Sequence, residues 1–135
     1  MGGPENLRVY GVLARQGRVL IAEERVAGRR VLKFPGGAVE EGETPEEALV
    51  REFAEESGIL VRPLKLVHAP GTLFSPWTEA NYTPLYYAVA GEGEPRVPPG
   101  EALTLAFMDP REAIGSERLA GPEVLTLKRV FGTEE

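Results

Sequence analysis

The strongest structural signal in the sequence is a short segment, from Thr44 to Gly58, that has the marks of a helix with two defined ends. Thr44 is a favourable N-cap residue, and Pro45 follows it at the first helical position, where a missing N–H costs little. Glu47 lies three residues after Thr44 and completes a capping box. Gly58 takes the C′ position, where the backbone commonly turns left-handed. These signals predict a helix over residues 45–57.

The segments on either side of this helix contain short apolar runs, which are typical of strands. The expected strands are residues 7–14, 18–24, 31–34, 60–69, 82–90 and 102–108. Residues 35–37 (Pro-Gly-Gly) are expected to form a turn, and residues 91–100 a loop. Two more helices are expected, a short one that opens at 109–112 and one over 122–131. This order predicts an α/β mixed (α+β) fold, with a mixed sheet covered by helices.

Composition narrows the classes of protein. A length of 135 residues suits one domain. The chain has no cysteine and one histidine, which excludes disulfide scaffolds, thiolate zinc sites and multi-histidine metal centres. Its 21 acidic and 15 basic residues give a net charge of −6, so no nucleic acid polymer is expected as a partner. No stretch approaches the roughly 18–20 apolar residues that span a membrane, and no secretion signal is present, so we expect a cytoplasmic protein without a membrane partner.

The predicted helix has an unusual acidic face. At about 100° per residue, Glu52, Glu55 and Glu56 share an arc of roughly 100° beside the apolar stripe of Leu49 and Phe53. Like charges at this spacing repel one another, and partial burial raises the cost. A divalent cation would remove the repulsion, and an all-oxygen ligand set suits Mg²⁺ or Mn²⁺ rather than zinc. The alternative is an acidic face that is simply solvated.

The residues around the helix form a longer pattern. It reads Gly37-(five residues)-Glu43-(seven residues)-Arg51-Glu52-Phe53-Ala54-Glu55-Glu56-Ser57-Gly58-Ile59. This resembles the Nudix box, G-x5-E-x7-R-E-U-x-E-E-x-G-U with U a bulky aliphatic residue, which is the signature of the Nudix hydrolase superfamily (MutT-like pyrophosphohydrolases). All seven fixed positions match, and Phe53 is the one departure, at a position where Leu, Ile or Val is usual. The resemblance implies a Nudix-type α/β/α sandwich, with residues 1–135 as a single Nudix hydrolase domain and the box at 37–59.

The resemblance also implies roles for the residues of the box. Glu52, Glu55 and Glu56 are expected to bind Mg²⁺ or Mn²⁺, helped by the backbone carbonyl of Gly37. Glu43 and Arg51 are expected to support the loop–helix–loop through a charge pair. The residues expected to let the loops close around the metals are Gly36, Gly37 and Gly58.

The implied reaction is metal-dependent hydrolysis of the pyrophosphate bond in a nucleoside diphosphate linked to another moiety. The expected catalytic residues are Glu56, Glu55, Glu52 and Arg51. Glu56 ranks first as the general base, ahead of Glu55. Family members also recruit a glutamate from a variable loop for this step, and the residues eligible here are Glu92, Glu94 and Glu101.

The substrate is less defined than the reaction. Lys33 and Arg15 are candidates for holding phosphate, as are the arginines at 25, 29 and 30, although each can also be a solvated surface charge. Phe74, Trp77 and Tyr82 are candidates for stacking on a base, with core or dimer packing as the alternative.

One short motif bears on the class of substrate. Phe74-Ser75-Pro76 is similar to the Ser-Pro element of ADP-ribose and nucleotide-sugar pyrophosphatases, which favours ADP-ribose or a nucleotide sugar. The alternatives are a MutT-like nucleoside triphosphate or dinucleoside polyphosphate pyrophosphohydrolase, and a non-catalytic nucleotide-binding regulator. The resemblance also allows a homodimer.

Overall fold

A mixed sheet forms the centre of the fold in the computed structural model, which describes residues 5–132. The strands are β1 (Leu7–Arg15), β2 (Arg18–Val26), β3 (Arg29–Lys33), β4 (Gly36–Ala38), β5 (Arg62–His68), β6 (Leu73–Ser75), β7 (Ala80–Ala90) and β8 (Leu103–Met108). The helices are α1 (Pro45–Ser57), α2 (Pro110–Ile114) and α3 (Gly121–Phe131). The main path of the sheet runs β3-β2-β1-β7-β5, with β4 on β1, β6 on β7 and β8 on β2.

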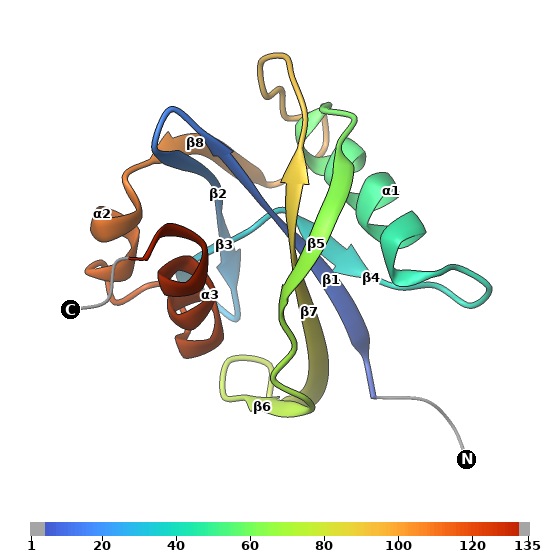
Figure 1. Cartoon of the computed structure of the whole chain (residues 1–135). Helices are drawn as coiled ribbons and strands as arrows, with labels where there is room; N and C mark the ends of the chain where they lie inside the picture. Colours follow the sequence, from blue (N-terminus) through green and yellow to red (C-terminus); the bar gives the residue numbers. More distant parts are fainter. Residues whose placement is uncertain (1–4, 133–135) are drawn as a thin grey trace.

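Strand β1 organises this sheet (Figure 1). It pairs in parallel with β7 from Leu7↔Thr83 to Leu13↔Val89, whereas all other named strand pairs are antiparallel. Its beginning also pairs with β4, and its end pairs with β2. The mixed sheet expected from the sequence is therefore confirmed.

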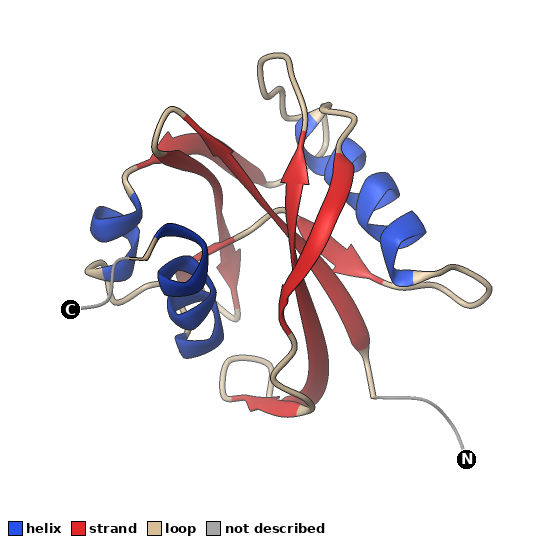
Figure 2. Ribbon diagram, in the orientation of Figure 1, coloured by secondary structure: helices blue, strands red, loops and turns tan. Residues whose placement is uncertain are grey.

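Helices cover the sheet on both faces (Figure 2). Side chains alternate along a strand, so Val9 and Leu13 of β1 pack with α1, while Tyr10 and Val12 join the cluster on the side of α2 and α3. Gly11 lies on the α1 face, where a Cβ would come within 2.8 Å of the Phe53 ring. Phe53 therefore fills the space left by this glycine, and the layers form the expected α/β/α sandwich.

Helix α1 has the predicted bounds, Pro45–Ser57, because its ends are set by local contacts. Thr44 and Glu47 form the complete capping box, and Gly58 ends the helix in the left-handed conformation, with φ at 74°. The backbone N–H of Gly58 donates to the Ala54 carbonyl. Gly58 thus ends the helix at the predicted position.

Two strands were not predicted from the sequence. Residues 36–38 form β4, where a turn was expected, because Gly36 and Gly37 let the backbone lie close to its neighbours rather than change direction. A Cβ on Gly36 would collide with the Val9 carbonyl oxygen of β1. Residues 73–75 form β6, a short strand that pairs with β7.

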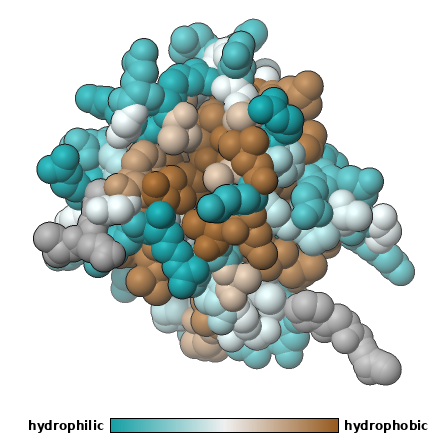
Figure 3. All heavy atoms as spheres, in the orientation of Figure 1, coloured by the Kyte–Doolittle hydropathy of each residue, from teal (hydrophilic) through white to brown (hydrophobic). Residues whose placement is uncertain are grey.

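The outer edge at β5 is rich in exposed apolar side chains. Leu60 is 76% exposed, Leu64 56% and Leu66 46%. Apolar atoms gather on this face, over β5 and β7 (Figure 3). Within residues 5–132, no helix is long and apolar enough to cross a membrane.

Candidate active site

Two carboxylates of α1 lie directly against the backbone of β4. A Cβ on Gly37 would overlap the carboxylate of Glu52, so only a glycine leaves room for it. The backbone N–H of Gly36 donates to Glu56 Oε1 at 3.2 Å. Gly36 and Gly37 therefore let two glutamates of the box lie against β4.

Arg51 ties this helix to the loop before it. Its Nε and Nη2 donate to the two oxygens of Glu43 at 2.7 and 2.9 Å, and Nη2 also donates to the Ala38 carbonyl at 3.1 Å. The expected charge pair is thus present, and in the bidentate form. Donation from Arg51 lowers the pKa of Glu43 to about 2. Both groups are charged at neutral pH, so the loop is fixed to α1.

Arg51 also contacts two glutamates of the acidic face. Its Nη1 lies 3.0 Å from Glu52 Oε2 and 3.4 Å from Glu55 Oε2. The Glu55 side chain is 54% exposed, whereas that of Glu52 is largely covered. Glu55 therefore sits at the rim of the site, and Glu52 sits inside it.

Lys33 lies on the other side of the site, between two acids. Its Nζ is 3.2 Å from Glu24 Oε1 and 3.7 Å from Glu56 Oε2. Burial raises the pKa of Glu56, while Lys33 and the Gly36 N–H oppose the rise. Burial alone would lower the pKa of Lys33, but Glu56, Tyr10 and Glu24 outweigh it and the net pKa is raised. The sequence predicted a site role for Lys33 but gave no sign of Glu24.

The three glutamates of the box do not gather as the sequence predicted. Within residues 5–132, no group of three or more His, Cys, Asp or Glu side chains is placed to hold one metal ion. Glu52 and Glu55 instead share Arg51, and Glu56 faces Lys33. Like charges repel, so each carboxylate turns to a neighbouring cation. The donor set still fits a hard divalent cation, because Glu52 and Glu56 approach the same two glycines and every available donor is an oxygen.

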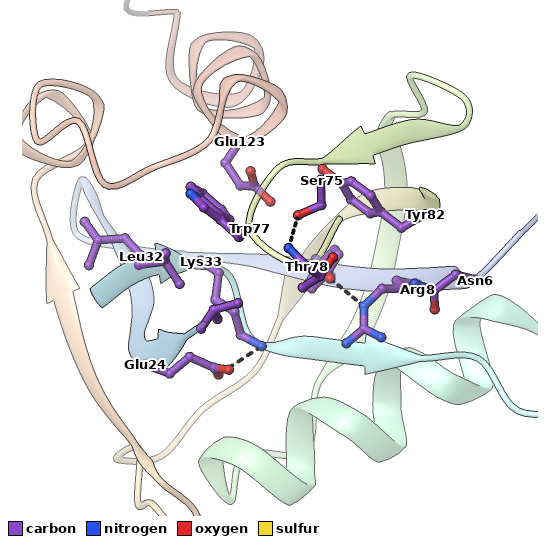
Figure 4. Close-up of a pocket in the computed structure, with 13 residues that line it drawn as sticks. Asn6, Arg8, Glu24, Leu32, Lys33, Ser75, Trp77, Thr78, Tyr82 and Glu123 are labelled. Atoms are coloured by element: carbon purple, nitrogen blue, oxygen red, sulfur yellow. Dashed lines mark hydrogen bonds and ion pairs between the residues drawn. The ribbon is translucent and has the colours of Figure 1, made fainter. Parts of the chain in front are cut away.

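A cavity of about 290 Å³ is connected to the box glutamates through Lys33, which lines the cavity and contacts Glu56 (Figure 4). The box glutamates themselves are not among its lining residues. Lys33, Trp77 and Tyr82 line it, so three of the predicted substrate-binding residues come together. Trp77 belongs to the turn between β6 and β7, and Tyr82 belongs to β7. Basic and aromatic groups therefore face one space beside the acidic helix.

Arg8 and Glu123 also line this cavity, and the sequence did not indicate either. Arg8 Nε donates to the Tyr10 hydroxyl at 2.8 Å. Burial lowers the pKa of Arg8, but Tyr10, Glu52 and Glu56 outweigh it and the net pKa is raised. Arg8 thus adds a positive charge between the cavity and the carboxylates. The only sign of Arg8 in the sequence was its position as a basic residue in an apolar strand pattern, and basic residues are common at strand ends.

Two predicted substrate-binding residues lie elsewhere. Arg15 donates to the carbonyls of Gly91 and Gly93 and stacks on Phe107, so its charge is used within the fold. Phe74 does not line the cavity and is 61% exposed. It alternates with Ser75, which does line the cavity, because successive strand residues face opposite sides.

The alternative general bases occupy different places. Glu92 lines a separate cleft with Leu60, away from the box glutamates, and Glu94 is exposed. Glu101 lines a cleft that also includes Glu24, the partner of Lys33. Of the three loop acids, Glu101 is the one that shares a cleft with a residue of the site.

The remaining early arginines belong to the hairpin of β2 and β3. Arg30 pairs with Glu23 at 2.8 Å, and Arg25 donates to the Gly28 carbonyl. Arg29 lines a separate cleft with Trp77. Within the described residues, none of the three arginines lines the cavity that contains Lys33 and Tyr82.

This α/β/α sandwich, with a carboxylate-bearing helix against two strand glycines, has the architecture of a Nudix hydrolase. The family model for the NUDIX domain matches residues 4–129. The chain therefore belongs to the Nudix family. Nudix hydrolases generally use divalent metal cations and act on small nucleotide substrates.

Curated relatives are named as pyrophosphate-cleaving enzymes. The 8-oxo-dGTP diphosphatase of Escherichia coli (strain K12) is 33% identical over 106 residues, which is 73% of this chain and 80% of that protein. The RNA pyrophosphohydrolase of Mannheimia succiniciproducens is 40% identical over 55 residues, which is 41% of this chain but only 27% of the relative. These similarities support a hydrolase.

Solved structures share the fold. A MutT NUDIX hydrolase from Burkholderia pseudomallei has a TM-score of 0.79 at 23% identity, covering 96% of this chain and 99% of that one. A UDP-X diphosphatase has a TM-score of 0.71 at 18% identity, covering 99% of this chain and 66% of that one. At these identities the likeness establishes the architecture alone.

Proposed function

We propose that the protein hydrolyses a pyrophosphate bond within a nucleotide, with Mg²⁺ or Mn²⁺ held by the box glutamates. The observation that carries this proposal is the position of Glu52 and Glu56, against Gly36 and Gly37 and next to the cavity reached by Lys33. Such an arrangement brings acidic metal ligands and a substrate cavity together.

The residues of the site have different roles in the proposed reaction. Glu52, Glu56 and the rim residue Glu55 would hold the cation, with the Gly37 carbonyl beside them. The cation, when bound, supplies neutralisation of phosphate charge and acidification of a water molecule. Arg51 fixes Glu43 and steadies Glu52, so the helix face keeps its position during turnover.

Proton transfer is assigned to Glu56. Its side chain is 11% exposed, and burial raises its pKa, which makes it a better proton acceptor than an exposed carboxylate. Lys33 keeps it oriented through the contact at 3.7 Å. Glu55 and Glu101 remain the alternatives, since one lies at the rim and the other shares a cleft with Glu24.

Two substrate classes have support. The position of Ser75 in the cavity favours ADP-ribose or a nucleotide sugar, because it belongs to the Phe74-Ser75-Pro76 motif. The Escherichia coli relative named 8-oxo-dGTP diphosphatase favours a nucleoside triphosphate. A cavity of about 290 Å³ is at the small end of ligand sites and suits one nucleoside better than the two of a dinucleoside polyphosphate.

Product analysis decides between these classes. With Mg²⁺ or Mn²⁺ present, ADP-ribose would give AMP and ribose 5-phosphate, whereas a nucleoside triphosphate would give a monophosphate and pyrophosphate. Glu56→Gln and Glu55→Gln should lower turnover by orders of magnitude with the fold retained, and the exposed Glu112→Gln, in the first turn of α2, serves as the matched control. Nucleotide binding without cleavage of any member of the panel would instead indicate a regulatory binding domain.

Two further features belong to this proposal. We place the protein in the cytoplasm, as the sequence predicts. A homodimer would use the exposed apolar residues near β5, among them Leu60 and Leu64, and light scattering of the purified protein tests it.

A further inference from the structure

Glu123 is a buried carboxyl group that the proposed reaction does not use. It lies in the first turn of α3, and only 7% of the residue is exposed. Its Oε2 accepts a hydrogen bond of 2.8 Å from the Tyr86 hydroxyl. Its Oε1 has no hydrogen-bond partner among the described residues. One oxygen of this carboxyl group is therefore fixed by the sheet, and the other is buried without a partner.

The unpartnered oxygen belongs to a side chain that lines the cavity containing Lys33. Glu123, Trp77 and Tyr82 reach this cavity from α3, from the turn between β6 and β7, and from β7 (Figure 4). Trp77 and Tyr82 offer aromatic faces, and Glu123 offers a hydrogen-bond acceptor. Flat stacking surfaces beside one polar group are what a heteroaromatic ring needs for oriented binding.

A purely structural role explains the hydrogen-bonded oxygen of this carboxyl group but not the unpaired one. Fastening α3 to the sheet requires the bond to Tyr86 alone, and a neutral amide would make that bond without a buried charge. Burial raises the pKa of Glu123 to about 7, against the opposing effects of the Tyr86 donation, the backbone N–H of Glu123 itself and the positive charge of Lys33. Another titratable group that interacts with the carboxyl group is the phenol of Tyr82. The cost of burying an acid with an unpaired oxygen points to a ligand that donates to it.

We propose that Glu123 determines base specificity, with its Oε1 accepting a hydrogen bond from the exocyclic amino group of a nucleobase held in this cavity. The inference rests on the proposed function in taking a nucleotide as the substrate. The inference adds that the base is selected by its exocyclic amino group. A carbonyl at the same position would set two acceptors against each other, and bases of that kind should bind less well.

Two pairs of nucleoside monophosphates isolate this contact. AMP and IMP differ in carrying an amino or a carbonyl group at one position of the purine ring, and CMP and UMP differ in the same way on the pyrimidine ring. The phosphate and ribose are constant within each pair, so the ratio of dissociation constants reports on the base. Trp77 is the one tryptophan of the chain, so its fluorescence follows binding, and calorimetry gives the same constants independently. The titrations are done with Mg²⁺ present and at pH 8.5, where the carboxyl group of Glu123 is charged. The monophosphates contain no pyrophosphate bond, so no hydrolysis contributes.

We expect the wild-type protein to bind AMP over IMP, or CMP over UMP, by about tenfold, which is the effect of one hydrogen bond to a carboxylate. Glu123→Gln should reverse the preference. Its amide oxygen must accept from Tyr86, which leaves the NH₂ group, a donor, facing the cavity. Tyr86→Phe should keep the wild-type preference, because the carboxyl group remains. The double variant should lose the reversal, because the amide is then free to turn.

Equal affinities within both pairs in the wild-type protein would overturn the inference, as would the absence of nucleotide binding. Equal affinities are also the result expected if a buried water, rather than a base, occupies Oε1. An unchanged preference in Glu123→Gln would assign the selection to another residue and overturn it too. These outcomes are separate from the hydrolysis assay, since base preference without cleavage would refute only the proposed reaction, and cleavage without base preference would refute only the role of Glu123.

Discussion

Replacing Glu123 by glutamine should make the stability of the protein less dependent on pH. Burial raises the pKa of Glu123 from 4.5 to about 7 in the folded protein. Between these values the unfolded chain loses a proton that the folded chain keeps, so the free energy of unfolding falls as the pH rises. The destabilisation caused by the buried negative charge is absent below about pH 4.5 and complete above about pH 7. This difference in pKa between the folded and the unfolded chain corresponds to a loss of about 3 kcal/mol in the free energy of unfolding. The side chain is buried, so solvent screening removes little of this effect.

Urea unfolding at a series of pH values measures this effect. Because the calculated pI is about 5.0, the series should run from pH 5.5 to 8.5, a range that contains about 2 kcal/mol of the expected change. The free energy of unfolding of Glu123→Gln, relative to the wild type, should increase across this range and then level off. Any packing defect of the amide shifts all values equally and does not alter the slope.

Two variants make the result specific to Glu123. Glu112→Gln removes an exposed acid from the first turn of α2 and controls for the loss of one negative charge. Tyr86→Phe removes the donor that holds down the pKa of Glu123, so it should steepen the loss of stability with rising pH. If the difference between Glu123→Gln and the wild type varied by less than about 0.5 kcal/mol over the series, the argument from burial would be wrong.

The remaining predictions concern the box. Gly37→Ala should push the Glu52 carboxylate aside and lower the rate of hydrolysis with the fold retained, which circular dichroism and a rate assay would check together. Gly58→Val should cost about 1–2 kcal/mol or more in urea unfolding, because φ there is 74°, and an unchanged midpoint would contradict this. Mn²⁺ at a hundredfold excess over its dissociation constant should stabilise the protein by about 2.7 kcal/mol, and Glu52→Gln with Glu56→Gln should abolish this gain in a melting experiment.

Local signals explain why some of the structure was predictable from the sequence. The bounds of α1 follow from Thr44, Glu47 and Gly58, which act within one turn of the helix ends. The family signature follows from the same segment. Pro63, which has no N–H to donate to a neighbouring strand, is a local sign of an edge or a bulge, and it lies in the edge strand β5 at a shift in register.

Non-local contacts explain what the sequence did not reveal. Gly36 and Gly37 look like turn residues until β1 and Glu52 are placed against them. Arg8 and Glu123 belong to the site only because β1 and α3, more than a hundred residues apart in sequence, face one cavity. The contact of Glu56 with Lys33 of β3 was likewise outside the reach of helix geometry, whereas Arg51, which contacts Glu52 and Glu55, belongs to α1 itself.

The balance of charge at the site gives a physical reason for a divalent cation that does not depend on the family. The carboxylates at the site outnumber the positive side chains. The positive ones are Arg8, Lys33 and Arg51, and the carboxylates in contact or in electrostatic reach of them are Glu24, Glu40, Glu43, Glu52, Glu55 and Glu56, with the buried Glu123 near Lys33. Lys33 and Arg51 are paired with acids, and Arg8 donates to the Tyr10 hydroxyl. The net negative charge would repel a pyrophosphate, and a divalent cation offsets part of it. The phosphates carry negative charge of their own. Tight nucleotide binding at this site should therefore require more divalent cation than is needed to neutralise the glutamates alone.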